Sequence, residues 1–346
     1  MTLDADTTVR AGFAMQGTKR WLITAGAAGA FADARCIASS NGAVVVVGQG
    51  NATMTVGGKA VTAGMFIARL DPATGQATFA KTIPRAVPLE AATDATGNIV
   101  VTGFFDGTVD FGGGPVTSIA NTTDIFVAKY SGTDGAHVWS KAVGGNSFDF
   151  GTALALDAAG DVYVGGSFSQ TANFGAGNVT SAGGATDDIF VARYGAANGA
   201  FVWVKTFGNA DNEQLYGLAV DRNGAVVVAG TFTGSVNIGG TFLNSGTGGS
   251  DALLAKLDGA NGAVLFAKDL GGAGGDSGQR VAIDKANNIV VQGTYTVPAD
   301  VGGSPLPAGT MFVAKYTAAG AHIWSRGFAA NSGRIAVDSF DDSAVV

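Results

Sequence analysis

The stretch ALALDAAGDVYVGG at residues 153–166 decides the fold, because similar copies of it recur along the chain. Each copy has an apolar run, a turn that usually begins with aspartate, and a β-branched run that ends in glycine. The other copies are GLAVDRNGAVVVAG at 217–230, RVAIDKANNIVVQG at 280–293, EAATDATGNIVVTG at 90–103 and the weaker CIASSNGAVVVVG at 36–48. Self-similarity at a long, nearly constant period indicates a repeat architecture.

Each copy continues into two further apolar runs. The third runs are MFIARL, DIFVAKY, DIFVARY, DALLAKL and MFVAKY, and the fourth runs are anchored by Phe79, Trp139, Trp203, Phe266 and Trp324. Four short runs rich in Val, Ile, Phe and Ala predict a four-stranded antiparallel meander. Radial repetition of such sheets is the arrangement of a β-propeller, which protects the strand edges.

The two ends of the chain carry complementary halves of one repeat. The last copy, RIAVDSFDDSAVV at 334–346, stops after its second run, whereas the N-terminus begins with a third-run match, AGFAMQ at 11–16, and a fourth-run match that ends at Trp21. We therefore predict an all-β single domain over residues 1–346, a six-bladed β-propeller closed by a split blade. Its whole blades are expected at about 34–81, 88–141, 151–205, 215–268 and 279–326, and the split blade combines 333–346 with 8–24.

Composition narrows the possible partners. The chain has 346 residues, 47% of them hydrophobic, and a net charge of −7, which argues against a nucleic-acid surface built from clustered Lys and Arg. No apolar run approaches the roughly 20 residues that span a bilayer, so no membrane span is expected. The start MTLDADTTVR lacks the charged and apolar regions of a signal peptide.

The sequence pattern of the four runs resembles that of the bacterial β-propeller repeat family often labelled SBBP. The shared features are the aspartate turn, the segments VDFGG and VNIGG, the strand DIFVAKY, and VWSK or IWSR followed shortly by glycine. This resemblance covers nearly the whole chain and implies blade architecture without any single activity. It also implies an extracytoplasmic setting, which is expected only if a leader has been removed; otherwise the chain is cytoplasmic.

Comparison between repeats separates framework residues from candidates for function, because framework residues recur at one position. His137 and His322 align with Phe201, Val264, Ala77 and Lys19, which predicts a packing or surface position. Cys36 aligns with first-run Leu, Val, Ile and Ala residues, so we expect a buried apolar residue; a single cysteine forms no internal disulfide.

Two further recurring sets are expected to belong to the framework. The hairpin aspartates should cap backbone N–H groups, and they are Asp94, Asp157, Asp221, Asp284 and Asp338. Ten cations recur on the third and fourth runs and should pair with nearby carboxylates or cover apolar surface; they are Arg69, Lys129, Arg193, Lys256 and Lys315, and Lys81, Lys141, Lys205, Lys268 and Arg326.

One set of acids is found in only half of the repeats. Asp149, Glu213 and Asp276 each precede a hairpin aspartate by the same interval, where the other repeats have Phe31, Ala86 and Ala330. The predicted meander places them on loops at the mouth of a central channel, where they form the candidate ligand and metal site. Three carboxylates there are suited to Ca²⁺ or to a cationic group of a partner, with Asp211 and Asn212 as further ligands. The alternative is that they are solvated loop acids or partners of the framework cations.

The second-to-third connections contain a recurring turn, with Asp110, Asn173, Asn237 and Asp300 aligned. Recurrence favours a structural turn or a small hairpin. Repeated pockets between blades are also how propeller lectins bind sugars, which would require Phe111 or Phe174 to be exposed for stacking.

No nucleophile elbow, zinc-protease motif, phosphate-binding loop or C-x-x-C pair is present. We therefore predict a non-enzymatic binding module that engages a protein or a surface polymer, such as a polysaccharide, at its loop face, with Ca²⁺ as the one candidate cofactor. A hydrolase or lyase that uses carboxylates such as Asp149 and Asp276 is one alternative, and a multivalent glycan-binding lectin is another. The sequence leaves the oligomeric state open.

Overall fold

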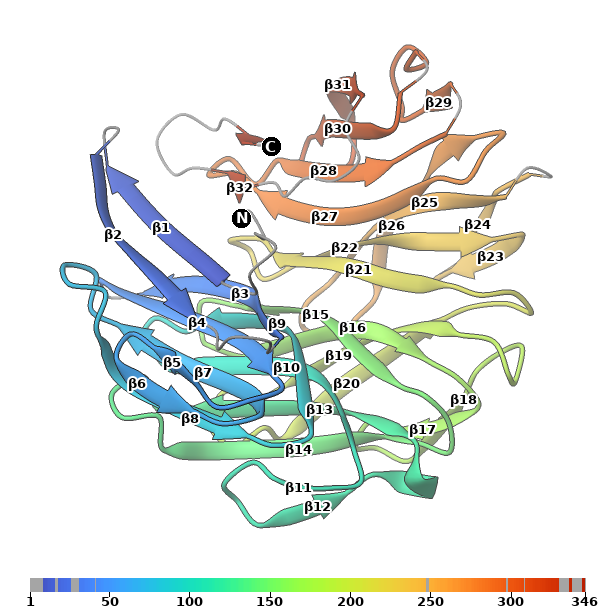
Figure 1. The fold of residues 1–346 in the computed structure, drawn as a ribbon. Helices are drawn as coiled ribbons and strands as arrows, with labels where there is room; N and C mark the ends of the chain where they lie inside the picture. Colours follow the sequence, from blue (N-terminus) through green and yellow to red (C-terminus); the bar gives the residue numbers. More distant parts are fainter. Residues whose placement is uncertain are drawn as a thin grey trace. The chain divides into compact units, whose positions relative to one another are not determined.

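A computed structural model describes residues 9–15, 18–25, 31–40, 42–246, 249–296, 298–307, 309–329, 336–337 and 344–345. The chain divides into two compact units, Met1–Gly144 (unit 1) and Gly145–Val346 (unit 2). Figure 1 shows the strands in chain order, from blue at the N-terminus to red at the C-terminus. No helix in these described ranges has the length and apolar character needed to cross a bilayer.

Unit 1 contains a hairpin followed by two antiparallel meanders. The hairpin is β1 (Val9–Met15) with β2 (Thr18–Ala25). The first meander is β3 (Ala32–Ser40), β4 (Ala43–Gly50), β7 (Gly64–Leu70) and β8 (Ala77–Ile83). The second is β9 (Ala86–Thr93), β10 (Ile99–Asp106), β13 (Thr123–Tyr130) and β14 (His137–Gly145), whose last residue begins unit 2.

Unit 2 repeats the meander. Its complete meanders are β15 (Phe150–Leu156), β16 (Val162–Phe168), β19 (Asp188–Tyr194) and β20 (Phe201–Phe207); β21 (Gln214–Val220), β22 (Val226–Thr233), β25 (Ser250–Leu257) and β26 (Val264–Gly272); and β27 (Ser277–Ile283), β28 (Ile289–Thr294), β30 (Met311–Tyr316) and β31 (His322–Phe328). A last antiparallel pair joins β32 (Ala336–Val337) to β33 (Ala344–Val345). The all-β class and the four-stranded meanders that resemble propeller blades are thus confirmed.

Small elements extend the connections between second and third strands, as the recurring turn predicted. The hairpins are β5 (Met54–Val56) with β6 (Lys59–Val61), β11 (Thr108–Asp110) with β12 (Pro115–Thr117), β17 (Thr171–Asn173) with β18 (Asn178–Thr180), and β23 (Ser235–Ile238) with β24 (Thr241–Asn244). A 3₁₀ turn spans Ile119–Asn121, and the short strand β29 (Ala299–Asp300) pairs with the end of β26.

The glycine that ends each predicted β-branched run lies inside a second strand of the structure, and its recurrence has a steric cause. A Cβ atom at Gly230 would collide with the carbonyl oxygen of Gln214 on the neighbouring first strand, and a Cβ at Gly166 would collide with that of Phe150. The first strand also bulges beside this glycine, between Leu215 and Gly217 in one meander. The recurring glycine therefore lets two strands approach closely where the register shifts.

The hairpin aspartates cap their turns, as predicted. Asp284 Oδ1 accepts hydrogen bonds from the backbone N–H groups of Ala286 and Asn288, at 2.8 and 2.7 Å. Asp157 does the same for Ala159 and Asp161, both at 2.9 Å. The fifth predicted cap, Asp338, lies outside the described residues.

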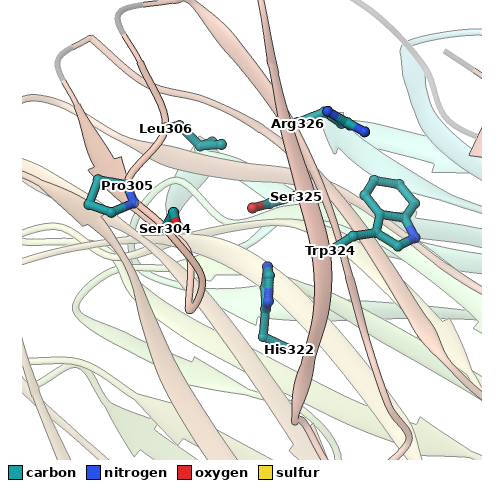
Figure 2. Close-up of a pocket in the computed structure, with 7 residues that line it drawn as sticks. All are labelled: Ser304, Pro305, Leu306, His322, Trp324, Ser325 and Arg326. Atoms are coloured by element: carbon teal, nitrogen blue, oxygen red, sulfur yellow. The ribbon is translucent and has the colours of Figure 1, made fainter.

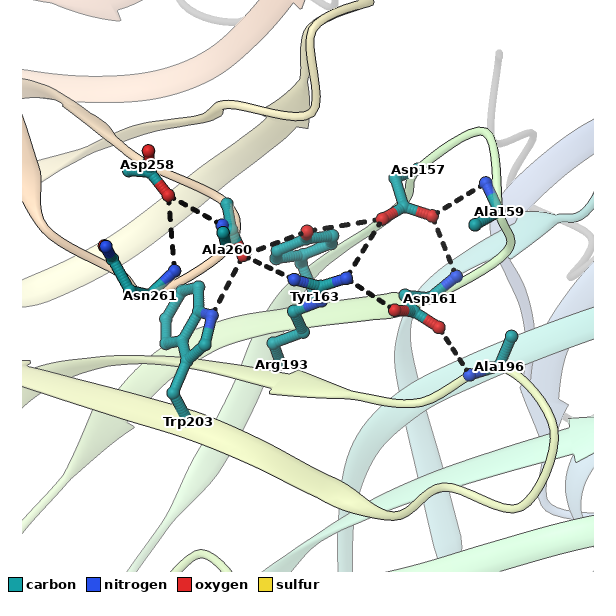
Figure 3. A network of polar contacts seen from close by, with 11 residues as sticks. Asp157, Ala159, Asp161, Tyr163, Arg193, Ala196, Trp203, Asp258, Ala260 and Asn261 are labelled. Carbon is teal, nitrogen blue, oxygen red and sulfur yellow. Dashed lines mark hydrogen bonds and ion pairs between the residues drawn. The ribbon is translucent and has the colours of Figure 1, made fainter.

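The predicted pairing with carboxylates is confirmed for four of the five third-strand cations, whereas Arg69 donates to the carbonyl oxygen of Gly132 at 2.7 Å. Buried ion pairs join Lys129 to Asp94 at 2.9 Å, Lys256 to Asp221 at 2.8 Å and Lys315 to Asp284 at 2.8 Å. In Figure 3, Arg193 contacts both Asp157 and Asp161, with an Arg193–Asp161 distance of 2.6 Å, and its guanidinium lies 5.5 Å from the centroid of the Tyr163 ring.

One turn is shared between neighbouring meanders of unit 2. The carbonyl oxygen of Gly259, in the turn between β25 and β26, accepts hydrogen bonds from Arg193 at 2.8 Å and from Trp203 Nε1 at 2.9 Å. The Tyr163 hydroxyl donates to the same oxygen at 3.3 Å. The framework cation and the fourth-strand aromatic of one meander thus bind the turn of the next, which explains why both recur.

Candidate functional site

The three predicted site acids are buried inside their own loops. Asp149 and Glu213 are 0% exposed and Asp276 is 1% exposed. Each carboxylate accepts the backbone N–H of the residue four positions earlier: Gly145 for Asp149, Asn209 for Glu213 and Gly272 for Asp276, at 2.7, 2.9 and 2.8 Å. The structure therefore contradicts the prediction that these three carboxylates are exposed to solvent.

A second contact anchors these loops to the preceding meander. The N–H of Glu213 donates to the carbonyl oxygen of Asp187, and the N–H of Asp276 donates to that of Ser250, both at 2.7 Å. These hydrogen bonds give Glu213 and Asp276 a structural role at the fourth-to-first connection. The described ranges contain no cluster of three or more His, Cys, Asp or Glu side chains placed to hold a metal ion, so the structure does not gather the three predicted acids around a cation.

The buried loop acids lie beside a second set of acids that sequence comparison had not singled out. Asp188 and Asp251 begin third strands and are 3% and 4% exposed. The charge of Asp188 contributes to the raised pKa of Glu213, and that of Asp276 contributes to the raised pKa of Asp251. Two meanders of unit 2 thus each bury a pair of neighbouring carboxyl groups.

At the second of these pairs the surface opens into a pocket, here called the acidic pocket. It has a volume of about 340 Å³ and contains three carboxylates, Asp251, Asp269 and Asp300. The remaining lining residues are Asn244, Ser245, Gly246, Gly271, Gly272 and Gly302. None of these residues is a Lys, Arg or His, so the carboxylates have no cationic partner in the pocket wall.

The pocket is assembled by the end of β26. Gly271 pairs with Asp300 of β29, and a Cβ atom at Gly271 would lie 2.5 Å from Asp251 Oδ1 and 2.9 Å from Asp276 Oδ2. The missing side chain of Gly271 therefore makes room for both carboxyl groups. The Oδ1 atoms of Asp251, Asp269 and Asp276 are buried, and no N–H or hydroxyl of the described residues donates to them.

These surroundings favour the protonated forms of the acids. Burial, followed by the charge of Asp269, raises the pKa of Asp251 from 3.8 to about 8. Burial also raises the pKa values of Asp269 and Asp276, against the lowering effect of hydrogen bonds from Asp251 and from the Gly272 N–H respectively. The carboxyl groups of Asp251 and Asp269 each influence the pKa of the other, so the two acids are neighbours in the pocket.

A functional residue on a repeated framework is expected in one repeat only, and Asp269 meets this expectation better than the three acids predicted from the sequence. It lies three residues after the fourth-strand aromatic Phe266, and the same position in the other complete repeats is Thr82, Ala142, Thr206 and Gly327. This signal was present in the sequence, because a functional residue on a repeated framework is expected to break the repeat. Asp300, by contrast, belongs to the recurring turn and accepts the N–H of Gly302 at 2.7 Å.

An exposed aromatic ring flanks the acidic pocket. Phe242 is 77% exposed, and it lies two residues before Asn244 on β24, so both side chains are on one face of that hairpin. Asn244 lines the pocket. An exposed aromatic beside a group of carboxylates is a feature of surfaces that bind cationic side chains.

A second cavity, of about 670 Å³, lies at β31 and includes His322, Trp324, Arg326 and Leu306. Figure 2 shows His322 and Ser325 on the side of β31 that faces the loop of Ser304 to Leu306. Much of this wall is framework, because His322, Trp324 and Ser325 recur as His137, Trp139 and Ser140.

The packing role predicted for the histidines is confirmed. The rings of His137 and His322 meet Tyr130 and Tyr316 edge-on, at centroid distances of 6.2 and 5.7 Å. Phe201 makes the equivalent contact with Tyr194 at 6.3 Å. The same aromatic contact is thus made by the three repeats that have His or Phe at this position.

Two further predictions concern buried residues. Cys36 is 3% exposed, as predicted, and its Sγ donates to the carbonyl oxygen of Leu89. Phe111 and Phe174 are each 1% exposed and pack against other phenylalanines, with centroid distances of 4.8 Å to Phe126 and 4.6 Å to Phe190. Neither ring offers a face on which a sugar could stack, as the lectin alternative requires.

Comparison with known proteins assigns no family and no activity to the chain. No protein-family model matches the chain, and no curated protein does either. Among solved structures, it is similar to BamB from Moraxella catarrhalis, at 14% identity and a TM-score of 0.44, over 93% of this chain and 82% of that one. It is also similar to a europium-containing methanol dehydrogenase, at 12% identity and a TM-score of 0.45, over 93% and 70% of the two chains. These similarities are to β-propeller proteins, whereas the resemblance to the SBBP repeat family stays a prediction.

Proposed function

We propose that this chain is a non-enzymatic binding module, a six-bladed propeller closed by a split blade, which holds a basic segment of a protein partner at the acidic pocket. The observation that carries the proposal is the set of three carboxylates, Asp251, Asp269 and Asp300, around one open pocket without a cation in its wall. Such an arrangement leaves negative charge partly desolvated, and a cationic partner would relieve that cost.

The exposed ring of Phe242 supports a macromolecular partner. Aromatic side chains are enriched in protein interfaces, and the ring of Phe242 is 77% exposed beside the carboxylates. A basic peptide could place one cationic side chain in the pocket and pack its stem on Phe242. A surface polymer with amino groups would use the same carboxylates, so it is an alternative outcome of the test.

The test uses a fluorescently labelled octa-arginine peptide as the probe, with octa-glutamate and a neutral glucan as comparison ligands. The variant Asp269→Thr/Asp300→Asn removes two carboxylates with residues that other repeats already carry at these positions, Thr82 and Thr206 or Asn173 and Asn237. We expect fluorescence anisotropy to show at least about tenfold weaker octa-arginine binding by this variant, equivalent to 1.4 kcal/mol.

The matched control is Asp110→Asn, the equivalent of Asp300→Asn on the recurring turn of unit 1. It removes one negative charge far along the sequence from the pocket residues, whereas the pocket variant removes two, so the single variant Asp300→Asn is compared with it directly. Equal loss of binding in the control, or no loss in the pocket variant, would show that the peptide is attracted only by the net charge of −7. Ca²⁺ is included as a competitor. A calcium site predicts that Ca²⁺ displaces octa-arginine from the pocket, whereas a site for an organic cation predicts that it does not.

A second candidate function, hydrolysis or elimination on a polymer, rests on the Asp251–Asp269 pair. Two carboxyl groups of which one is protonated and the other ionised can act as acid and base. Asp149 and Asp276, the pair suggested by the sequence, are buried and hydrogen-bonded in their loops. New reducing ends released from a panel of polysaccharides by the wild-type chain, and abolished by Asp269→Thr, would favour this function over binding alone.

A further inference from the structure

We draw no further inference here: the strongest candidate, the cavity of about 670 Å³ between β31 and the loop of Ser304 to Leu306, is walled largely by framework residues that recur in another repeat, and nothing in the structure shows what covers it.

Discussion

At the scale of single residues, Glu213 shows what burial does to a loop acid. Burial, only partly offset by the N–H groups of Asn209 and Thr233, raises its pKa from 4.5 to about 7. The folded chain therefore holds this proton more tightly than the unfolded chain does. The resulting stabilisation is complete below pH 4.5 and is lost as the pH rises through about 7.

We expect Glu213→Gln to remove this pH dependence. At about 1.4 kcal/mol per pKa unit, the wild type should lose roughly 2–3 kcal/mol of stability between pH 5 and pH 8 through this group. The variant should lose less, because Gln keeps an oxygen for the Asn209 N–H and cannot ionise. Urea-unfolding midpoints at the two pH values provide the measurement.

Asp211→Asn is the matched control for this prediction, because Asp211 is an exposed acid in the same loop. It should retain most of the pH dependence of the wild type, because burial is the largest cause of the raised pKa of Glu213 and the charge of Asp211 is the smallest. The same slope in the wild type and in Glu213→Gln would show that Glu213 is ionised in the folded chain, contrary to its burial.

Sequence comparison identified several of these acids but not their environments. Asp149, Glu213 and Asp276 were recognised because three repeats have an acid where the others have Phe or Ala. Their burial could not be predicted, since it depends on how the loop folds back so that each carboxylate meets the N–H four residues earlier. Asp269 could have been found by the same comparison applied to the fourth strand.

At the scale of strands and turns, the framework was largely predictable, because each recurring residue has one local cause. The hairpin aspartates cap two N–H groups, and the recurring Asn or Asp of the second-to-third turn accepts an N–H of a glycine that follows it. The bulges were not predicted, although they recur with the repeat. One lies beside the second-strand glycine, as between Leu215 and Gly217, and the other follows the third-strand cation, as between Lys256 and Leu257.

The closing glycine allows a test at this scale. Gly230→Ala places a Cβ atom against the carbonyl oxygen of Gln214 and near the Leu215 backbone, at a position where neither strand can move without breaking the ladder. Overpacking of this kind costs about 1–3 kcal/mol. We expect a lower midpoint of urea unfolding with no change in its slope.

Gly195→Ala is the control for the glycine prediction. Its nearest atom would be the carbonyl oxygen of Ala200 at 3.7 Å, which is an ordinary contact. The control should stay within about 0.5 kcal/mol of the wild type, as surface changes usually do. Equal stability of the two variants would mean that the close approach of the two strands does not require glycine at this position.

At the scale of the whole molecule, stability should depend on contacts between neighbouring repeats. Within unit 2, Arg193 and Trp203 of one meander both donate to Gly259 in the turn of the next. Such contacts couple each sheet to its neighbour, as in other repeat proteins. The two terminal strand pairs, β1 with β2 and β32 with β33, each form half of the four-stranded pattern seen in every complete meander.

We predict that deletion of residues 1–24 abolishes cooperative unfolding. If the terminal halves combine into the sixth blade, the deletion removes β1 and most of β2 and leaves strand edges and an apolar sheet face without a partner. Thermal unfolding followed by circular dichroism should then be broad, begin at lower temperature and be accompanied by aggregation. Deletion of residues 1–8 alone, which stops before β1, is the control and should melt like the full chain. A sharp, unshifted melt after deletion of 1–24 would show that unit 2 and the remaining meanders of unit 1 are stable without the N-terminal hairpin, and the split blade would be refuted.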